Sequence, residues 1–305
     1  MKDSKLNIAV LIPCRNEELT VGQVIAGFRS EFPESTIYVC DNASTDQTSS
    51  CAVKAGAKVL YEPIAGKGRV LRRMFSDIEA DIYILVDGDG TYDPAEASFM
   101  VKTLLDEGLD MVTGSRTTIS AINTRRSHVF GNSAFNYLYR FLFGAEFSDI
   151  FTGYRILSRR LVKSFPALSS GFEIETELSV HASQLCLPVA EVPVSYRARP
   201  EGSKSKLRTI PDGFRILRSM ISMLKENRPF FMFGSLSLLS CVTATVLAIP
   251  LIVTYVDTGL VPRLPTAVLS ASLILLSLLL MVAGLILDSV TKSRIEVKRI
   301  AYLQS

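Results

Sequence analysis

The chain has 305 residues, of which 21% are charged, and a formal net charge of only +3. This length allows one full-sized α/β domain and something smaller, because domains usually hold about 100–200 residues. So small a net charge excludes nucleic acid as an expected partner. The five cysteines are odd in number and lack paired metal-ligand spacing, which favours reduced thiols over a disulfide framework.

Short β-branched runs alternate with helical patterns in the first part of the chain. The predicted strands cover residues 8–12, 36–40, 58–61, 82–86 and 111–113, and the predicted helices cover 18–29, 45–55, 67–77 and 94–107. Strands separated by helical segments of this kind indicate βαβ units and a mostly parallel sheet. In such a sheet, ligands bind beyond the carboxyl ends of the strands.

Polar motifs follow three of these predicted strands. They are Pro13-Cys14-Arg15-Asn16-Glu17, Asp41-Asn42-Ala43-Ser44-Thr45-Asp46 and Asp87-Gly88-Asp89-Gly90. Each alone is compatible with a turn or a helix cap, since Asn, Asp and Ser favour those positions. In a parallel sheet, however, all three motifs converge on one rim, and this shared position favours a ligand site.

Asp87 and Asp89 place two carboxylates directly after a strand predicted to be buried. Mg²⁺ and Mn²⁺ bind carboxylate oxygens together with substrate phosphates, and one or two carboxylates are the usual protein contribution. Such a metal neutralises charge on a departing diphosphate. Gly88 and Gly90 keep bulk away from the site. A lone Asp-x-Asp is common in loops, so the metal hypothesis depends on the preceding strand and the other two motifs.

The order and spacing of these motifs resemble family 2 glycosyltransferases of the GT-A fold. The resemblance is carried by Ile12-Pro13-Cys14-Arg15-Asn16-Glu17-Glu18, Asp41-Asn42-Ala43-Ser44-Thr45-Asp46, Gly66-Lys67-Gly68 and Asp87-Gly88-Asp89. Two later motifs, Phe151-Thr152-Gly153-Tyr154-Arg155 and Arg199-Pro200-Glu201-Gly202-Ser203-Lys204, resemble the dolichyl-phosphate mannose synthase branch and its bacterial polyprenyl-phosphate relatives. The resemblance implies a Rossmann-like GT-A catalytic domain with a mostly parallel sheet.

The resemblance also implies roles for individual residues. It assigns the nucleotide-sugar to Pro13, Arg15, Glu17, Val39, Asp41, Lys67, Asp87 and Gly88. It assigns the metal to Asp89 together with Asp87, and catalytic roles to Asp89 and Asp149. The chain departs from the pattern at Thr91, where many relatives have Gln, and at Arg15, where many have Tyr.

Basic residues form the acceptor side in this interpretation. A phosphate needs cationic partners, and the resemblance indicates Arg116, Arg126 and Arg199, with Lys204 beside the last of them. The alternative is that each of these side chains faces solvent or anionic lipid. A phosphate monoester has a second pKa near 6, so the acceptor is already largely dianionic at pH 7 and a single displacement would invert the anomeric centre.

Three acidic residues are harder to assign. Asp149 orients the sugar or the acceptor, or else it forms a turn or an ion pair with Arg155. Glu173 and Glu175 point to the same face if their segment is extended, yet a solvated face explains them equally well. Neither glutamate is placed in the catalytic set.

Two stretches near the C-terminus, residues 230–256 and 266–287, contain no Asp, Glu, Lys or Arg. Each exceeds the roughly 20 residues that a helix needs to cross a hydrocarbon core, which favours two transmembrane helices over buried helices of a soluble core. Residues 211–225 have the apolar spacing of a helix that lies in the membrane interface or docks on the catalytic domain. The expected domains are therefore 1–209 (catalytic), 210–229 (juxtamembrane helix) and 230–305 (helical hairpin with a tail).

Basic residues flank these stretches on one side only. They are Arg215, Arg218, Lys225 and Arg228 before the first, and Lys292, Arg294, Lys298 and Arg299 after the second. The connecting loop carries only Arg263. Because basic residues resist translocation, a multi-pass membrane protein with its catalytic domain and both termini in the cytoplasm is expected.

The expected function is inverting transfer of a UDP- or GDP-linked sugar to a polyisoprenyl phosphate at a lipid bilayer, with Mg²⁺ or Mn²⁺. One alternative is a processive polysaccharide synthase, but such enzymes resemble this chain less because they typically carry a Gln-x-x-Arg-Trp motif and this chain has no Trp. A non-catalytic membrane scaffold is the other, and it would be expected to lose the metal carboxylates or acceptor arginines. The sequence does not identify the sugar or the polyprenol. It also leaves the oligomeric state open, and a homo-oligomer is compatible with this interpretation.

Overall fold

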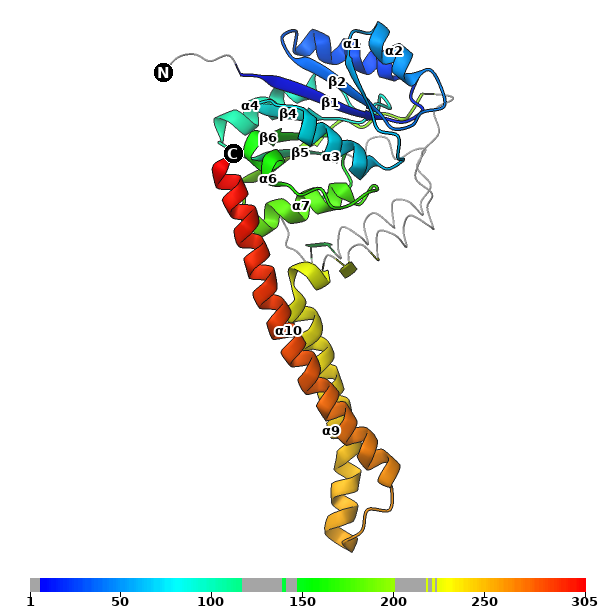
Figure 1. Ribbon diagram of the computed structural model, residues 1–305, viewed down its shortest axis with the longest axis vertical. Helices are drawn as coiled ribbons and strands as arrows, with labels where there is room; N and C mark the ends of the chain where they lie inside the picture. The colour runs from blue at the N-terminus through cyan, green and yellow to red at the C-terminus, as the bar shows by residue number, and fades with distance from the viewer. Residues whose placement is uncertain (1–5, 117–138, 141–146, 201–217, 219–220, 223) are drawn as a thin grey trace. The chain divides into compact units, whose positions relative to one another are not determined.

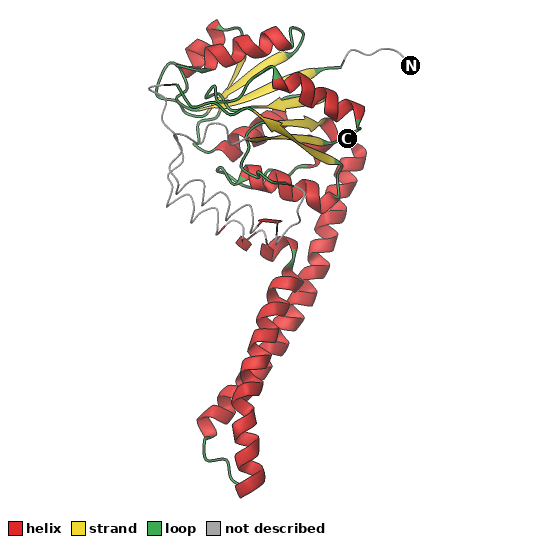
Figure 2. Ribbon diagram, turned by 180° about the vertical axis from the view of Figure 1, so that it is seen from behind, coloured by secondary structure: helices red, strands yellow, loops and turns green. Residues whose placement is uncertain are grey.

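The computed structural model describes residues 6–116, 139–140, 147–200, 218, 221–222 and 224–305. The chain divides into two compact units, one formed by Met1–Leu217 with Lys298–Ser305 and the other by Arg218–Val297. The first unit contains a sheet covered by helices, and the second contains long helices (Figures 1 and 2). The last residues of the chain therefore belong to the sheet unit.

A seven-stranded sheet organises the first unit, in the order β3-β2-β1-β4-β6-β5-β7. The strands are β1 (Ile8–Cys14), β2 (Thr36–Asp41), β3 (Lys58–Tyr61), β4 (Ile82–Leu85), β5 (Met111–Arg116), β6 (Arg155–Ser158) and β7 (Val189–Val194). Only β6 runs antiparallel to its neighbours among these strands. The predicted mostly parallel α/β sheet is confirmed, and the five predicted strands are all present.

Helices cover both faces of this sheet. They are α1 (Val21–Glu31), α2 (Thr48–Lys54), α3 (Lys67–Asp77), α4 (Glu96–Asp106), α6 (Arg159–Ser164) and α7 (Ile174–Leu185). Helices α1, α2 and α4 share one hydrophobic core with the strands, which includes Phe28, Met100 and Ile156. On the other face, Phe75 of α3 packs edge-on against Tyr83 of β4 and against Phe165. Because both faces are covered, β4 is a continuous buried run rather than an alternating one.

The direction of strand addition reverses between β1 and β4. From β1 the chain adds β2 and β3 on one side, whereas β4 pairs with the other edge of β1. A crevice forms at such a switch point, because the loops that leave the two strands diverge. Leu11 of β1 pairs with Leu85 of β4, so the Pro13-to-Glu17 and Asp87-to-Asp89 motifs leave the sheet at the same edge.

The core beside α7 contains a buried histidine. His181 is 1% exposed, its Nε2 lies 3.0 Å from the Ser164 hydroxyl, and its ring packs edge-on against Phe165. Its Nδ1 has no hydrogen-bond partner within the described part of the chain. Burial lowers the pKa of His181 to about 3, with a smaller contribution from the Lys298 charge. The folded protein therefore keeps this ring neutral.

Acid should destabilise the protein partly through His181. The pKa of His181 is about 3 when folded and about 6.5 when unfolded, so below pH 6.5 only the unfolded chain takes up the proton. The stabilisation is thus complete above pH 6.5 and is lost as the pH falls, by about 2 kcal/mol between pH 6.5 and 5. We expect His181→Gln to show a correspondingly smaller difference in the free energy of unfolding between pH 7 and pH 5. Equal pH dependence in the two proteins would contradict this.

Two long helices, α9 (Pro229–Thr258) and α10 (Leu264–Gln304), contain the stretches predicted to span a membrane. With 30 and 41 residues, both are long and apolar enough to cross one. Small residues are buried along them, namely Ser237, Ser240, Ala244, Ser270, Ser277 and Gly284. The Ser237 hydroxyl donates to the Ser277 carbonyl at 2.8 Å, and the Ser277 hydroxyl donates to the Ser237 carbonyl at 2.9 Å. Such small, hydrogen-bonding residues let helices pack closely without a hydrophobic driving force.

Part of the expected organisation falls outside the described residues. Of the predicted juxtamembrane helix, 210–229, only residues 218, 221–222 and 224–229 are described. Residues 224–227 are helical, and Thr291 of α10 donates a hydrogen bond to the Glu226 carbonyl at 2.9 Å. The juxtamembrane helix as a whole stays a prediction.

Candidate active site

A cleft with a volume of about 690 Å³ opens where β1 and β4 end. Of the residues predicted from the sequence, Pro13, Arg15, Glu17, Lys67, Asp87, Gly88, Asp89, Arg116 and Arg199 line it. Val39, Asp41 and Asp149 are buried and are not part of the lining. Arg126 and Lys204 lie outside the described residues. The structure thus brings the acidic motif and two of the predicted acceptor arginines into one cleft.

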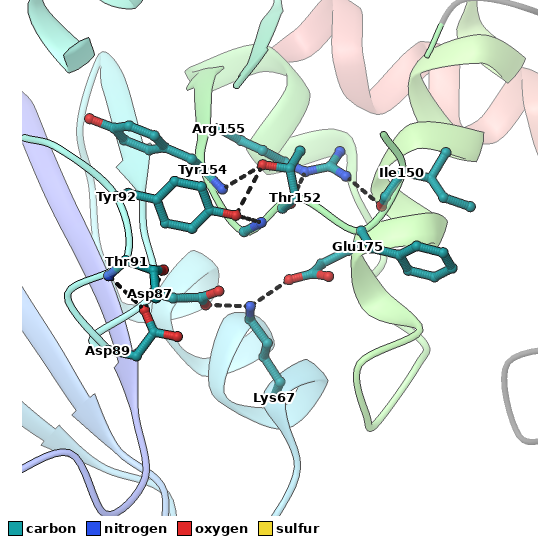
Figure 3. A network of polar contacts seen from close by, with 12 residues as sticks. Lys67, Asp87, Asp89, Thr91, Tyr92, Ile150, Thr152, Tyr154, Arg155 and Glu175 are labelled. Atoms are coloured by element: carbon teal, nitrogen blue, oxygen red, sulfur yellow. Dashed lines mark hydrogen bonds and ion pairs between the residues drawn. The ribbon is translucent and has the colours of Figure 1, made fainter. Parts of the chain in front are cut away.

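Lys67 lies between two carboxylates inside the cleft. Its ammonium nitrogen lies 2.5 Å from Asp87 Oδ1 and 2.5 Å from Glu175 Oε1 (Figure 3). Burial alone would lower the pKa of Lys67, but the two carboxylates outweigh burial and raise that pKa above its ordinary value. Burial also raises the pKa of Glu175, an effect that the Lys67 charge opposes. Lys67 is therefore a cation that connects Asp87, after β4, to the first turn of α7.

Asp89 is almost fully buried, with 2% of its surface exposed. One of its oxygens, Oδ1, accepts hydrogen bonds from the Thr91 backbone N–H at 3.1 Å and from the Thr91 hydroxyl at 2.6 Å (Figure 3). The other oxygen, Oδ2, lies 2.6 Å from Arg199 Nη2. Arg199 Nη1 is also 4.0 Å from Glu17 Oε1. Thr91 thus orients the carboxylate, and its second oxygen faces a cation.

Arg116, at the end of β5, forms a two-pronged ion pair with Asp149. Its Nε lies 2.6 Å from Asp149 Oδ2, and its Nη2 lies 2.8 Å from Oδ1. Burial would raise the pKa of Asp149, but the hydrogen bonds and charge of Arg116 outweigh burial and hold that pKa below its usual range. Asp149 therefore pairs with Arg116, and the alternative pairing with Arg155 is wrong. An orienting role for Asp149 stays a prediction.

Two glycines allow close approaches around the acidic motif. A Cβ atom on Gly153 would lie 2.2 Å from Asp87 Oδ2, and one on Gly88 would lie 2.4 Å from the Cys14 sulfur. No larger residue fits either position without moving its neighbours. The Phe151-to-Arg155 motif therefore presses its backbone against Asp87, which explains why a glycine stands at its centre.

The side chain of Arg155 fixes the backbone of the Phe151-to-Arg155 motif. It is completely buried, and its guanidinium donates to the carbonyl oxygens of Thr152 and Ile150, each at 3.1 Å (Figure 3). It also donates to the Ser179 hydroxyl at 3.0 Å. Burial lowers its pKa below the ordinary value. The backbone that contacts Asp87 is thus tied to β6 and α7 by one buried cation.

Replacing Arg155 with leucine should lower the free energy of unfolding by about 3 kcal/mol, because two buried carbonyls and a hydroxyl lose their donor. Chemical denaturation of the full chain in detergent measures this change. Arg159→Leu is the matched control: Arg159 pairs with Glu79 at 2.8 Å, but both side chains are largely exposed. That control should change the free energy of unfolding by less than about 0.5 kcal/mol. Similar losses in both variants would contradict the clamping role of Arg155.

Several lining residues were not assigned from the sequence. Glu173 and Glu175 were left unassigned, and the extended segment considered for them is wrong, because Glu173 is the N-cap position of α7 and Glu175 lies in its first turn. Tyr92 and Tyr196 also line the cleft, with ring centres 5.2 Å apart. The Arg116 guanidinium lies 5.4 Å from the centre of the Tyr196 ring, within cation–π range. No motif in the sequence indicated that these two tyrosines line the cleft.

Asp41 is held by its own turn. Its Oδ1 accepts a hydrogen bond from the Ser44 N–H at 3.0 Å, and its Oδ2 accepts one from the Ser49 hydroxyl. The next residue, Asn42, lines the cleft instead, and its side-chain oxygen accepts from the Gly66 N–H at 2.6 Å. The nucleotide-binding roles of Val39 and Asp41 therefore stay predictions, and Asn42 is a lining residue that the motif contained.

Asp87 and Asp89 are the candidate metal ligands, and their surroundings allow a test of fit. Within the ranges that the structure describes, no group of three or more His, Cys, Asp or Glu gathers around a metal position. Asp87 is engaged by Lys67, whereas Asp89 Oδ2 faces the Arg199 guanidinium. A carboxylate oxygen that already accommodates a cation fits a divalent ion whose other ligands come from a diphosphate and water.

The chain is similar in sequence to known glycosyltransferases. The family model described as glycosyl transferase family 2 matches residues 9–165. The glycosyltransferase AglJ of Haloferax volcanii is 37% identical over 251 residues, which cover 81% of this chain and 81% of AglJ. The dolichyl-phosphate hexose transferase of the same organism is 30% identical over 222 residues, which cover 73% of this chain and 96% of that protein.

The fold also has solved counterparts. Glucosyl-3-phosphoglycerate synthase from Mycobacterium tuberculosis, crystallised with Mn²⁺, uridine diphosphate and phosphoglyceric acid, matches with a TM-score of 0.59 and 23% identity over 72% of this chain and 79% of that one. At this identity the likeness concerns the fold, and it confirms the GT-A architecture. Because the family model spans just over half of the chain and AglJ aligns with most of it, the protein is a glycosyltransferase of family 2.

Proposed function

We propose that this glycosyltransferase moves a sugar from a nucleotide-sugar onto a polyisoprenyl phosphate, with Mg²⁺ or Mn²⁺ held at Asp89 and Asp87. The observation that carries the proposal is that both carboxylates share one cleft with Arg116 and Arg199. A donor diphosphate with its metal needs the carboxylates, and an acceptor phosphate needs the arginines. The match to a dolichyl-phosphate hexose transferase over 96% of its length supports the same acceptor class.

The donor end of the cleft lies at the carboxyl ends of β1 and β2. Pro13, Arg15 and Glu17 line it, and Asn42 adds an amide bonded to Gly66. These groups suit the base and ribose of a nucleotide, which bind at the switch point of such sheets. The diphosphate would then extend toward Asp89.

Arg116 and Arg199 would hold the acceptor phosphate. Arg116 is kept in one orientation by the two-pronged contact with Asp149, so little rotamer entropy is lost when a phosphate binds it. The phosphate is already largely dianionic at pH 7, and its attack on the anomeric carbon requires no general base. Positioning and charge stabilisation therefore account for catalysis, and a single displacement inverts the anomeric centre. When bound, the metal supplies positive charge at the departing diphosphate.

The long helices suit a lipid acceptor. Large apolar side chains such as Leu238, Leu279 and Ile286 are 60–67% exposed along them, which a bilayer would cover. The chain end returns to the sheet unit, where Tyr302 donates to Asp110 Oδ2 at 2.8 Å and Lys298 donates to Gln184 Oε1 at 2.9 Å. A hairpin that enters and leaves on one side of the membrane would let these last residues of α10 reach the sheet unit. The flanking Lys and Arg residues support a cytoplasmic location for that side.

The proposal is tested with purified full-length protein in nanodiscs that contain undecaprenyl or dolichyl phosphate. The protein is incubated with Mg²⁺ or Mn²⁺ and with UDP-glucose, UDP-N-acetylglucosamine or GDP-mannose, and the lipids are analysed by mass spectrometry. A lipid-linked monosaccharide from at least one donor is expected, and it should disappear with EDTA. A known polyprenyl-phosphate glycosyltransferase, active in the same nanodiscs, serves as the control. If that control works and this protein transfers sugar only to water-soluble phosphates, the proposed lipid acceptor is wrong.

A further inference from the structure

Glu175 lies in the cleft but has no place in the binding of nucleotide, metal or acceptor phosphate described above. It is 5% exposed, lies in the first turn of α7 and lines the cleft beside Lys67 (Figure 3). The loop before α7 is held against the start of α3, because the Gly68 N–H donates to the Ser170 carbonyl at 3.2 Å. Glu175 and Lys67 thus sit on one wall made of two segments far apart in the sequence.

Lys67 leaves part of the Glu175 carboxylate available to a ligand. Its nitrogen lies 2.5 Å from Asp87 and 2.5 Å from Glu175, and the buried Arg155 guanidinium adds a second positive charge that acts on Glu175. Two cations thus accompany the two carboxylates, which keeps Glu175 inside the cleft. Lys67 contacts only Oε1 of Glu175, so Oε2 can accept hydrogen bonds from a ligand in the cleft.

The chemistry of a nucleotide-sugar indicates which of its parts meets this wall. The diphosphate is anionic, so the arginines and the metal site attract it, whereas the Glu175 carboxylate does not. The sugar ring is neutral and carries several hydroxyl donors, and a carboxylate accepts such hydrogen bonds strongly. Asp87 and Glu175 use two of the three N–H donors of Lys67, so the third N–H can donate to an oxygen of the sugar ring.

We infer that Glu175, together with Lys67, forms the subsite for the sugar ring of the donor, in which the Glu175 carboxylate accepts hydrogen bonds from ring hydroxyls. This inference rests on the proposed use of a nucleotide-sugar and deepens it, because it assigns donor-sugar selection to the start of α7. Glu175 touches the substrate in this arrangement, whereas Asp87 positions Lys67.

The test compares Glu175→Gln with Glu177→Gln. Glutamine at 175 keeps the shape and an oxygen for Lys67 but removes the charge. Glu177 lies on the same helix, and its two carboxylate oxygens accept from the Leu168 and Ser169 N–H groups at 2.9 and 2.8 Å without lining the cleft. Two quantities are measured for each full-length variant: kcat/KM for the nucleotide-sugar that the wild type uses, and the inhibition constant of the matching free nucleoside diphosphate.

For Glu175→Gln we expect kcat/KM to fall by about 30- to 100-fold, while the inhibition constant of the nucleoside diphosphate changes less than about twofold. Glu177→Gln should alter both by less than about threefold, although its thermal midpoint falls. Unchanged kcat/KM in Glu175→Gln would overturn the subsite. A parallel loss of nucleoside diphosphate affinity would also overturn it, because Glu175 would then only support the cleft through Lys67. If the glutamine variant does not fold, Glu175→Asp is measured instead: it keeps the charge but withdraws the carboxylate from the ring by one methylene, so kcat/KM should again fall while the inhibition constant of the nucleoside diphosphate stays nearly unchanged, and unchanged kcat/KM would overturn the subsite.

A second readout separates this inference from the proposed function. Saturation-transfer NMR without any lipid detects ring-proton contacts of UDP-glucose, UDP-N-acetylglucosamine or GDP-mannose with the protein. Loss of ring contacts in Glu175→Gln with retained base contacts supports the subsite even if the lipid acceptor proves wrong. Retained ring contacts in that variant would overturn the subsite even if lipid transfer is found.

Discussion

Replacing Asp89 with asparagine is expected to reduce sugar transfer by about a thousandfold or more, with little change in fold. Asparagine preserves the size of the side chain and an oxygen for the two Thr91 hydrogen bonds. It removes the negative charge that a divalent cation requires, and loss of one such electrostatic contact at the reacting centre costs about 3–4 kcal/mol. The lipid-linked product is measured by mass spectrometry at saturating Mg²⁺, and folding is checked from the thermal midpoint.

Asp93 provides a matched control for Asp89. It also forms an ion pair with an arginine, Arg197, and lies only a few residues further along the chain, but neither residue lines the cleft. Asp93→Asn should keep transfer within about threefold of the wild type. Full turnover by Asp89→Asn, or an equal loss in both variants, would show that the carboxylate at 89 does not hold the metal. Mn²⁺ affinity, followed by electron paramagnetic resonance, should fall only in the Asp89 variant.

Much of the cleft could be predicted because it depends on local sequence. Each of the three polar motifs follows a strand, and parallel strands place their carboxyl ends along one edge. Once the strands at β1, β2 and β4 were identified, Arg15 and Asp89 had to lie near one another. At the end of β2, a turn closes on the carboxylate of Asp41, and the neighbouring Asn42 takes the lining position; the nucleotide role that the resemblance implies for Asp41 stays a prediction.

The sequence did not reveal which charged side chains pair with one another. Lys67 and Glu175 are 108 positions apart, and Arg116 and Asp149 are 33 apart. Such contacts depend on how α7 and β6 pack, and neither element was predicted. A pair of glutamates at positions 173 and 175 has the same spacing whether it begins a helix or lies in a strand. Only the helix start places Glu175 in the cleft.

Arg199 is the second residue whose loss should be severe. Replacing it with glutamine is expected to raise the KM for polyprenyl phosphate by about 10- to 100-fold, because a cationic partner of the phosphate is lost. The KM for the nucleotide-sugar should change less than about threefold. Both constants are obtained in nanodiscs of varied polyprenyl phosphate content, with lipid-linked sugar as the readout.

Arg197→Gln is the control for this change. Arg197 lies two positions earlier, pairs with Asp93 and is 65% exposed outside the cleft lining, so its loss should leave both KM values near those of the wild type. An unchanged acceptor KM in Arg199→Gln, or a matching rise in Arg197→Gln, would exclude the phosphate role and indicate a general effect of surface charge on the lipid.

The contact between Arg199 and Asp89 adds a further expectation for the same variant. The guanidinium lies 2.6 Å from the carboxylate oxygen that would face the metal, so the two cations compete for Asp89 Oδ2 in the absence of donor. Arg199→Gln should therefore bind Mn²⁺ at least as tightly as the wild type while it uses the lipid poorly. Weaker Mn²⁺ binding would instead mean that Arg199 supports the metal site, because removal of a competing cation cannot lower the affinity for the metal.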